Sequence, residues 1–166
     1  MKRNSGYTLI ELVVVISLIG LLLFIAVPRL HDTVLSDDTQ DVARWIAANV
    51  QALKHKTIQN HRGYTLHIDL DSRKMWITDA SMSPDEFQAA SRNAFLLPNG
   101  MKIPDVVFPD EEVIVAGTAD IRFYEKGYSD MAMIHVDGGG QQQSFLVEPF
   151  LPNVKIFAKH VGFENL

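Results

Sequence analysis

A long uncharged apolar segment near the N-terminus constrains this chain more than any other feature. From Leu12 to Val27 no residue is charged, and Leu, Val and Ile dominate its 16 positions. The rest of the 166-residue chain has a mixed composition, so the mean hydropathy of +0.04 averages two unlike parts. We therefore expect a targeting or membrane segment followed by one soluble domain, because the chain is too short for two well-buried cores.

The length of this segment alone does not decide how it meets a membrane. Sixteen residues are short for a span and close to the upper end of a secretory signal core. Counted from Tyr7 to Val27, the segment has 21 residues, and such a helix would cover about 30 Å, the thickness of a bilayer core. The extension includes Glu11. A carboxylate at mid-bilayer costs about 2.5–3.5 kcal/mol, so its presence is a functional hypothesis by default.

Two ordinary interpretations of the N-terminus compete with a functional one. A cleaved signal peptide would explain the basic residues Lys2 and Arg3, but residues 24–28 lack the small-x-small pattern that such cleavage requires. A plain uncleaved signal anchor would leave Glu11 without an explanation. Both alternatives stay open, and neither accounts for the residues that precede the apolar run.

Those residues form a motif, Gly6-Tyr7-Thr8-Leu9-Ile10-Glu11-Leu12. It resembles the N-terminal signal of type IV prepilins and pseudopilins. In that family a short basic leader ends in Gly, a Glu is the fifth residue after the cut, and a Pro lies near the twenty-second. With Tyr7 first, Glu11 is fifth and Pro28 is twenty-second. Tyr7 departs from the commoner Phe but keeps an aromatic ring.

The resemblance implies a substrate of an inner-membrane prepilin peptidase, which cuts after Gly6 and methylates the new amino group of Tyr7. Residues 1–6 would be the leader, and residues 7–28 the transmembrane and assembly helix, with Glu11 as its assembly residue. Basic residues beside an apolar segment stay cytoplasmic, which agrees with this orientation. The C-terminal domain is then expected in the periplasm, on a single-pass anchor in the inner membrane.

A stem helix over residues 29–62 is expected to follow the membrane segment. Pro28 removes a helix hydrogen bond, so a helix that continues through it should bend there. Gly63 is a natural stop. Apolar residues at helical spacing predict a face packed on the chain's own domain, with Trp45 at its edge and polar residues opposite. The apolar residues are Leu35, Val42, Ile46, Val50 and Leu53, and the polar ones are Arg44, Gln51 and His55.

A β-rich domain is predicted over residues 63–166. Alternation around Leu66, Ile68 and Leu70, with a turn at 71–73 and a return through Met75-Trp76-Ile77, indicates a β-hairpin. Ser83-Pro84-Asp85-Glu86 predicts a capped helix over residues 84–93. Further strands are expected at 106–108, 113–115, 121–123, 131–136, 144–147 and 154–157, separated by turns such as Gly127 and Gly138-Gly139-Gly140. The fold class is α+β: a long N-terminal helix packed on an antiparallel sheet, as in pilins.

Segments of the domain also resemble the H-type minor pseudopilins of the type II secretion system. These segments are 42–45, 51–53, 66–69 and 121–123 together with Gly127. The resemblance implies a structural subunit, not an enzyme, which assembles with other pseudopilins and helps to export folded proteins across the outer membrane. A minor type IV pilin serving adhesion or DNA uptake is the alternative, and a membrane-anchored enzyme is a third.

No cofactor or metal is expected. The chain has no cysteine, and its six histidines show no convincing ligand spacing, so surface histidines are the better interpretation. They are His31, His55, His61, His67, His135 and His160. Asp69-Leu70-Asp71 begins like a calcium loop, but Arg73 and Lys74 follow where oxygen donors are needed, so a hairpin turn is expected. No hydrolase motif or phosphate loop appears.

Nucleic-acid binding is not expected either. The formal net charge is −5, and without Lys2 and Arg3 thirteen basic residues face 20 acidic ones, which gives −7. The carboxylates at 110–112 are interpreted as a solvated loop. The C-terminal tail contains the basic residues Lys155 and Lys159, together with His160, and the acidic residue Glu164. These few basic residues do not form the patch that DNA binding requires.

Overall fold

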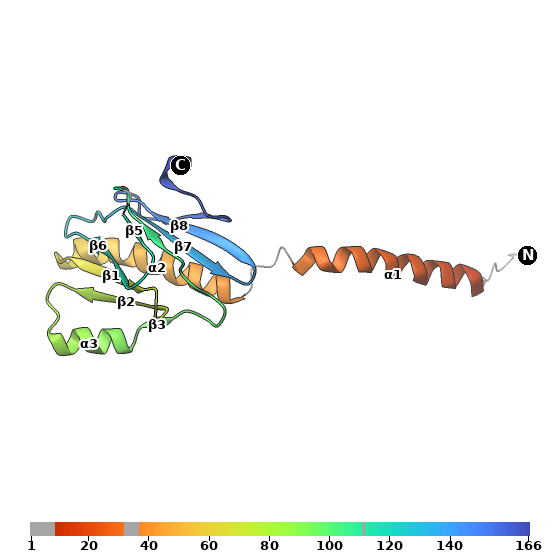
Figure 1. Cartoon of the computed structure of the whole chain (residues 1–166), viewed down its shortest axis with the longest axis horizontal. Helices are drawn as coiled ribbons and strands as arrows, with labels where there is room; N and C mark the ends of the chain where they lie inside the picture. The colour runs from red at the N-terminus through yellow and green to blue at the C-terminus, as the bar shows by residue number, and fades with distance from the viewer. Residues whose placement is uncertain (1–8, 32–36, 111) are drawn as a thin grey trace, which may run out of the picture. The chain divides into compact units, whose positions relative to one another are not determined.

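The structure is a computed structural model that describes residues 9–31, 37–110 and 112–166, without the side chains of 21–31, 37 and 165. The chain divides into two units, Met1–Leu35 and Ser36–Leu166, and each is described by itself (Figure 1). The predicted leader 1–6, with Gly6, and the predicted first residue Tyr7 lie outside the described residues, as does Leu35.

In its described residues, 9–31, the first unit forms helix α1 (Leu9–His31), whose 23 residues include Glu11 and Pro28. Its β-branched and Leu-rich sequence has no hydrophilic face that would mark a surface helix of a soluble domain. The helix continues through Pro28. The bend expected at this residue stays a prediction.

The second unit begins with α2 (Asp37–Asn60), which carries the predicted apolar stripe. Val42, Ile46 and Val50 have no exposed surface and Leu53 has 1%, so the prediction that this face packs on the domain is confirmed. Arg44, Gln51 and His55 are exposed, as expected. The helix ends earlier than Gly63 suggested, because His61 adopts the left-handed conformation (φ 51°) that terminates helices.

The expected hairpin is present as β1 (Tyr64–Asp69) and β2 (Lys74–Asp79). It belongs to an antiparallel sheet in the order β3-β2-β1-β6, with β3 at Phe95–Leu96 and β6 at Thr118–Phe123. The register places Leu66 opposite Ile77 on one side and Ile121 on the other. Leu66 and Ile121 are fully buried, so this face of the sheet lines the core.

A second antiparallel sheet has the order β5-β4-β7-β8-β9, so the predicted antiparallel β-domain is confirmed and consists of two sheets. The strands are β4 (Val106–Val107), β5 (Val113–Ile114), β7 (Ala132–Gly138), β8 (Gln141–Val147) and β9 (Lys155–Phe157). The predicted glycine turn joins β7 to β8, and both Gly139 and Gly140 have positive φ. Each expected strand has a counterpart, although several are shorter or begin earlier.

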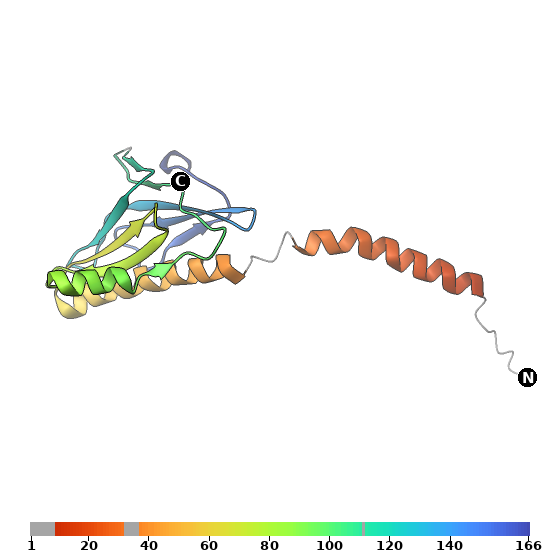
Figure 2. The ribbon, with the colours of Figure 1, turned by 60° about the horizontal axis from the view of Figure 1, so that its bottom comes forward.

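The core of the second unit lies between the apolar stripe of α2 and both sheets. Figure 2 shows α2 running along one side of the strands. A smaller cluster forms where the C-terminal segment crosses the five-stranded sheet, which it covers with Val161 and Phe163 against Met133 and Leu146. A single-turn 3₁₀ helix, η1 (Phe163–Asn165), ends this segment.

The predicted capped helix is α3 (Pro84–Arg92), which packs on β2 (Figure 1). Ser83 and Glu86 form the expected capping box: the Ser83 hydroxyl accepts from the Glu86 N–H at 3.3 Å, and the Glu86 carboxylate accepts from the Ser83 N–H at 2.8 Å. The Ser83 N–H and the Ser83 hydroxyl both donate to the Glu86 carboxylate and lower its pKa, with the backbone bond contributing most.

Candidate assembly surfaces

Helix α1 presents apolar side chains to solvent around its whole circumference over residues 9–20. The large ones are between 46% and 82% exposed: Leu9, Ile10, Leu12, Val13, Val14, Val15, Ile16, Leu18 and Ile19. Ser17 is internally satisfied, since its hydroxyl donates to the Val13 carbonyl at 2.8 Å. Exposed apolar surface of this extent marks a helix that is covered by another molecule or by lipid.

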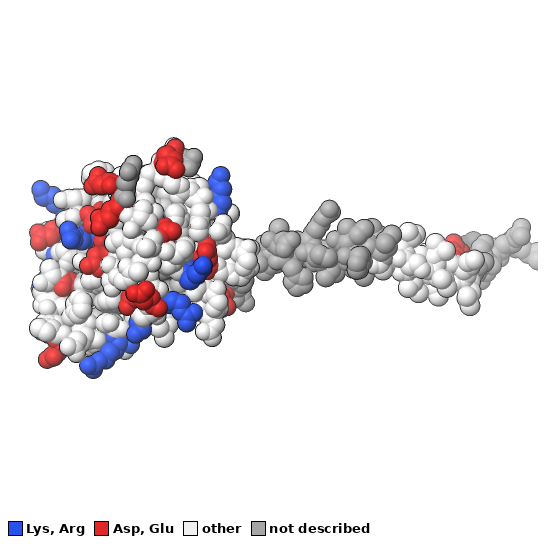
Figure 3. All heavy atoms as spheres, viewed as in Figure 1, with Lys and Arg blue, Asp and Glu red and all other residues white. Residues whose placement is uncertain are grey.

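Glu11 is exposed on this apolar helix and is the charged residue within the sequence of the stretch 9–20. Figure 3 shows acidic atoms on the described part of α1, which is otherwise white. Pro28 follows near the C-terminal end of the same helix. The structure therefore places two of the four predicted site residues on one helix, and their roles in assembly and bending stay predictions. In the part of the chain that the structure describes, no helix is both long and apolar enough to cross a membrane.

A groove of about 610 Å³ lies on the second unit, between α2 and two loops. We call it the α2 groove. One wall is formed by Ala48, Ala52 and Ile58, and the other by Gly127, Phe150 and Pro152. The sequence indicates Gly127 as a turn and as part of the pseudopilin resemblance, and it does not indicate Phe150, because nothing local shows that these loops meet α2.

Lys54 fixes the loop that carries Phe150. Its side chain is buried, and its ammonium donates to the backbone carbonyls of Glu148 and Leu151, which flank Phe150. Burial lowers the pKa of Lys54, and the nearby Glu148 carboxylate opposes that shift. The Phe150 ring is 83% exposed even though the backbone on both sides of it is held.

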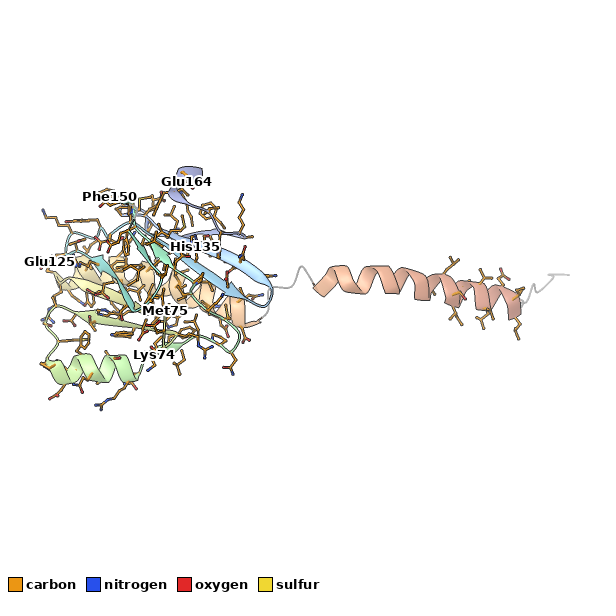
Figure 4. All side chains as sticks on the ribbon, viewed as in Figure 1. Lys74, Met75, Glu125, His135, Phe150 and Glu164 are labelled. Atoms are coloured by element: carbon orange, nitrogen blue, oxygen red, sulfur yellow. The ribbon has the colours of Figure 1, made fainter. Side chains whose placement is uncertain are left out.

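The second wall of the α2 groove depends on a glycine. Gly127 has φ +86°, and a Cβ there would lie 2.6 Å from Cδ1 of Ile58, closer than real carbon atoms approach. Next to it, Tyr128 stacks on Tyr124 with ring centroids 4.6 Å apart and contacts the Phe150 ring at 6.1 Å. Figure 4 shows Phe150 and Glu125, which precedes this turn, near the same end of the domain.

Of the five histidines whose side chains the structure describes, two are buried, so the expectation of surface histidines is wrong for them. His67 is 7% exposed and lies between Asp120 and Thr78, with its ring stacked on Trp76 and its edge against Phe87 of α3. This arrangement holds α3 on the outer face of the four-stranded sheet. Because the Phe87 ring and Trp76 enclose the imidazole, the cluster is a packing element and not an open catalytic site.

His135 is 8% exposed and anchors the C-terminal segment. Its Nδ1 lies 2.5 Å from Asp105 Oδ1, its Nε2 donates to the Val161 carbonyl at 3.0 Å, and its ring stacks on half-buried His160. His55 and His61 are exposed as expected, and the His31 side chain lies outside the described residues.

The other candidate sites have structural roles. Asp69 ends β1 in the expected hairpin turn, and its Oδ1 accepts from the backbone N–H groups of Asp71 and Ser72 at 3.1 and 2.9 Å. Hydrogen bonds from Ser72, with a smaller effect of Lys74, lower the pKa of Asp69. Among the described residues, no three His, Asp or Glu side chains are grouped to hold a metal ion.

Comparison with known proteins finds a motif match for the N-terminal residues and a similar fold for the domain. The prokaryotic N-terminal methylation motif matches residues 1–27. Two structures of the minor pseudopilin EpsH from the type 2 secretion system of Vibrio cholerae are similar. The first has a TM-score of 0.55 at 12% identity, covering 76% of this chain and 99% of that one. The second has a TM-score of 0.54 at 11% identity, covering 75% and 98%. A comparison with curated proteins finds no match.

Proposed function

We propose that this chain is a minor pseudopilin, a structural subunit of a type II secretion pseudopilus that helps folded proteins cross the outer membrane. The observation that carries the proposal is the combination of two independent parts. The methylation motif occupies residues 1–27, and the domain that follows has an EpsH-like α+β fold. The motif includes most of helix α1, whose large apolar side chains are exposed in the described stretch, and a domain with its own core follows.

In this proposal residues 7–28 anchor the chain in the inner membrane and later assemble into the filament, while residues 29–62 and 63–166 form the periplasmic stem and domain. A prepilin peptidase cuts after Gly6 and methylates Tyr7, so the protein is a substrate and not an enzyme. Cleavage also creates an ammonium at Tyr7. That cation can form a charge-assisted hydrogen bond with Glu11 of an adjacent subunit, which couples processing to assembly.

The test of processing is an intact-mass measurement on protein taken from its native membrane. The expected mass begins at N-methyl Tyr7, and replacing Gly6 with Val should leave the precursor uncut, because a branched side chain then fills space that the glycine leaves to the peptidase. A mass that begins at Met1 or near Pro28 would contradict the proposal, as would normal processing of Gly6→Val.

The test of the secretion role is a deletion strain. Loss of secreted enzymes, with twitching and transformation unchanged, is expected for a pseudopilin. The opposite pattern would assign the chain to a type IV pilus that serves adhesion or DNA uptake. The genes that neighbour this one distinguish the same two systems, because secretion and pilus operons encode different outer components.

A further inference from the structure

We propose that the α2 groove receives the apolar first helix of a neighbouring pilin-like subunit. This inference rests on the proposed function, because it names a receiving surface for the helix that the chain and its partners contribute to the filament. The groove would make the folded domain a direct participant in assembly, alongside contacts between first helices.

The chemistry of the α2 groove favours an uncharged occupant. Besides Lys54, the α2 residues that line the groove are Ala48, Gln51, Ala52, His55 and Ile58, and none of them is a carboxylate. The one ammonium in the lining belongs to Lys54 and is already bound by two backbone carbonyls. An acidic partner would therefore lose hydration here without gaining an ion pair from a lysine, and a basic partner would meet no carboxylate among the lining residues.

The shape of the α2 groove suits a helix. Ala48 and Ala52 are four residues apart, so they lie on one face of α2 and allow another backbone to approach closely. Opposite them, the exposed Phe150 ring belongs to a loop whose backbone carbonyls accept hydrogen bonds from Lys54. An exposed aromatic ring on a fixed loop is a preorganised anchor, since little conformational entropy is lost when a partner covers it.

The first helix has the complementary surface. From Leu12 to Ile19 the side chains of α1 are exposed and carry no charge, which matches the uncharged lining of the α2 groove. Glu11 precedes this stretch, so the segment proposed to occupy the α2 groove does not include it. Other exposed apolar residues of the domain, such as Leu96 and Val115, lie outside the α2 groove, so substitutions there serve as controls.

The experiment introduces the photo-reactive residue p-benzoylphenylalanine in place of Ala52 in the full chain, made at native level in its own strain. After illumination, the expected product joins this position to the first-helix peptide of a neighbouring subunit, identified by mass spectrometry. The probe at Gln88, an exposed residue of α3, is the matched control and should give no such product. Combining the Ala52 probe with Phe150→Ala should reduce the product roughly tenfold, whereas Leu96→Ala should not.

The outcomes separate this inference from the function on which it rests. If the probe at Ala52 joins to α1 of the same chain, the product keeps the mass of one chain, and this result overturns the inference. Capture of the globular domain of a neighbouring subunit overturns it as well. A probe at Val14 reports assembly through α1. If Val14 captures neighbouring subunits and Ala52 captures none, the inference fails and the pseudopilin proposal stands. If Val14 captures none in a strain that secretes normally, the proposed assembly role of α1 fails as well.

Discussion

His67 and Asp120 face each other across β1 and β6, with His67 Nδ1 2.7 Å from Asp120 Oδ1. The other ring nitrogen lies 2.8 Å from the Thr78 hydroxyl, so strands β1, β2 and β6 are tied together through one imidazole. Since α3 contributes Phe87 to the same site, this histidine also joins the helix to the sheet.

Replacing His67 with Ala is expected to lower the free energy of unfolding by about 1–3 kcal/mol, because it removes two hydrogen bonds and the ring that Trp76 and Phe87 contact. Urea unfolding, followed by circular dichroism, measures the change. His55→Ala, at an exposed position on α2, is the matched control and should change stability by less than about 0.5 kcal/mol. Equal stability of the two variants would show that the His67 cluster contributes nothing to folding.

Asp69 should give the domain an acid-sensitive contribution to stability. Its pKa is lowered in the folded chain by the Ser72 hydrogen bonds, so the unfolded chain binds a proton more readily. The stabilisation is therefore complete above the unfolded pKa of about 3.9 and is lost as the pH falls through the lower folded pKa.

Asp69→Asn tests this directly, because the amide can still accept hydrogen bonds but does not titrate. The variant should be less stable than the parent near neutral pH, and the difference should shrink as the pH falls below about 4. Urea unfolding at a series of pH values provides the measurement. Asp110→Asn, in an exposed loop, serves as the control. A difference between Asp69→Asn and the parent that does not vary with pH would contradict the assignment.

A fragment that begins at Arg29 should be a folded, soluble monomer that does not rescue function. The core joins α2 to both sheets, and residues 36–166 form a compact unit of their own. Sedimentation should show a monomer, and urea should unfold it cooperatively. Aggregation of the fragment at low concentration would instead mean that Leu12–Val27 is part of the fold.

Features set by neighbours in sequence were predictable. The stripe from Val42 to Leu53 follows from helical spacing, and the capping box at Ser83 and Glu86 lies within four residues. The β1–β2 hairpin likewise follows from alternation around a short turn. In each case the physical cause is local, so the pattern of residues contains the information.

Features set by distant pairings were not predictable in the same way. The division into two sheets depends on β6 pairing with β1 and β4 pairing with β7 across long stretches of chain. His67 and His135 are buried in contact with Asp120 and Asp105, which come from other segments. No pattern of residues in the sequence predicts these two pairs. The α2 groove is missed for the same reason, since Gly127 and Phe150 come from loops far from α2 in sequence.

The role of Glu11 can be tested by two substitutions that differ in charge and reach. The carboxylate is carried by an exposed apolar helix, where lipid or packed helices make charge unfavourable unless a cation approaches. The ammonium created at Tyr7 of an adjacent subunit is that cation in the proposed filament. Glu11→Ala should keep membrane insertion but weaken incorporation, and Glu11→Asp should give a partial defect because the shorter side chain keeps the charge and loses reach.

The measurement is cross-linking between cysteines placed beside residues 7 and 11 of different subunits, together with secretion assays at native expression level. The chain has no cysteine of its own, so each cross-link within this protein has a defined origin. Val14→Ala, on the same helix, controls for the loss of an apolar side chain and should retain incorporation. If Glu11→Ala assembles and supports secretion like the parent, the pairing is not needed, and α1 then acts as a processed membrane anchor without a charge-directed step in assembly.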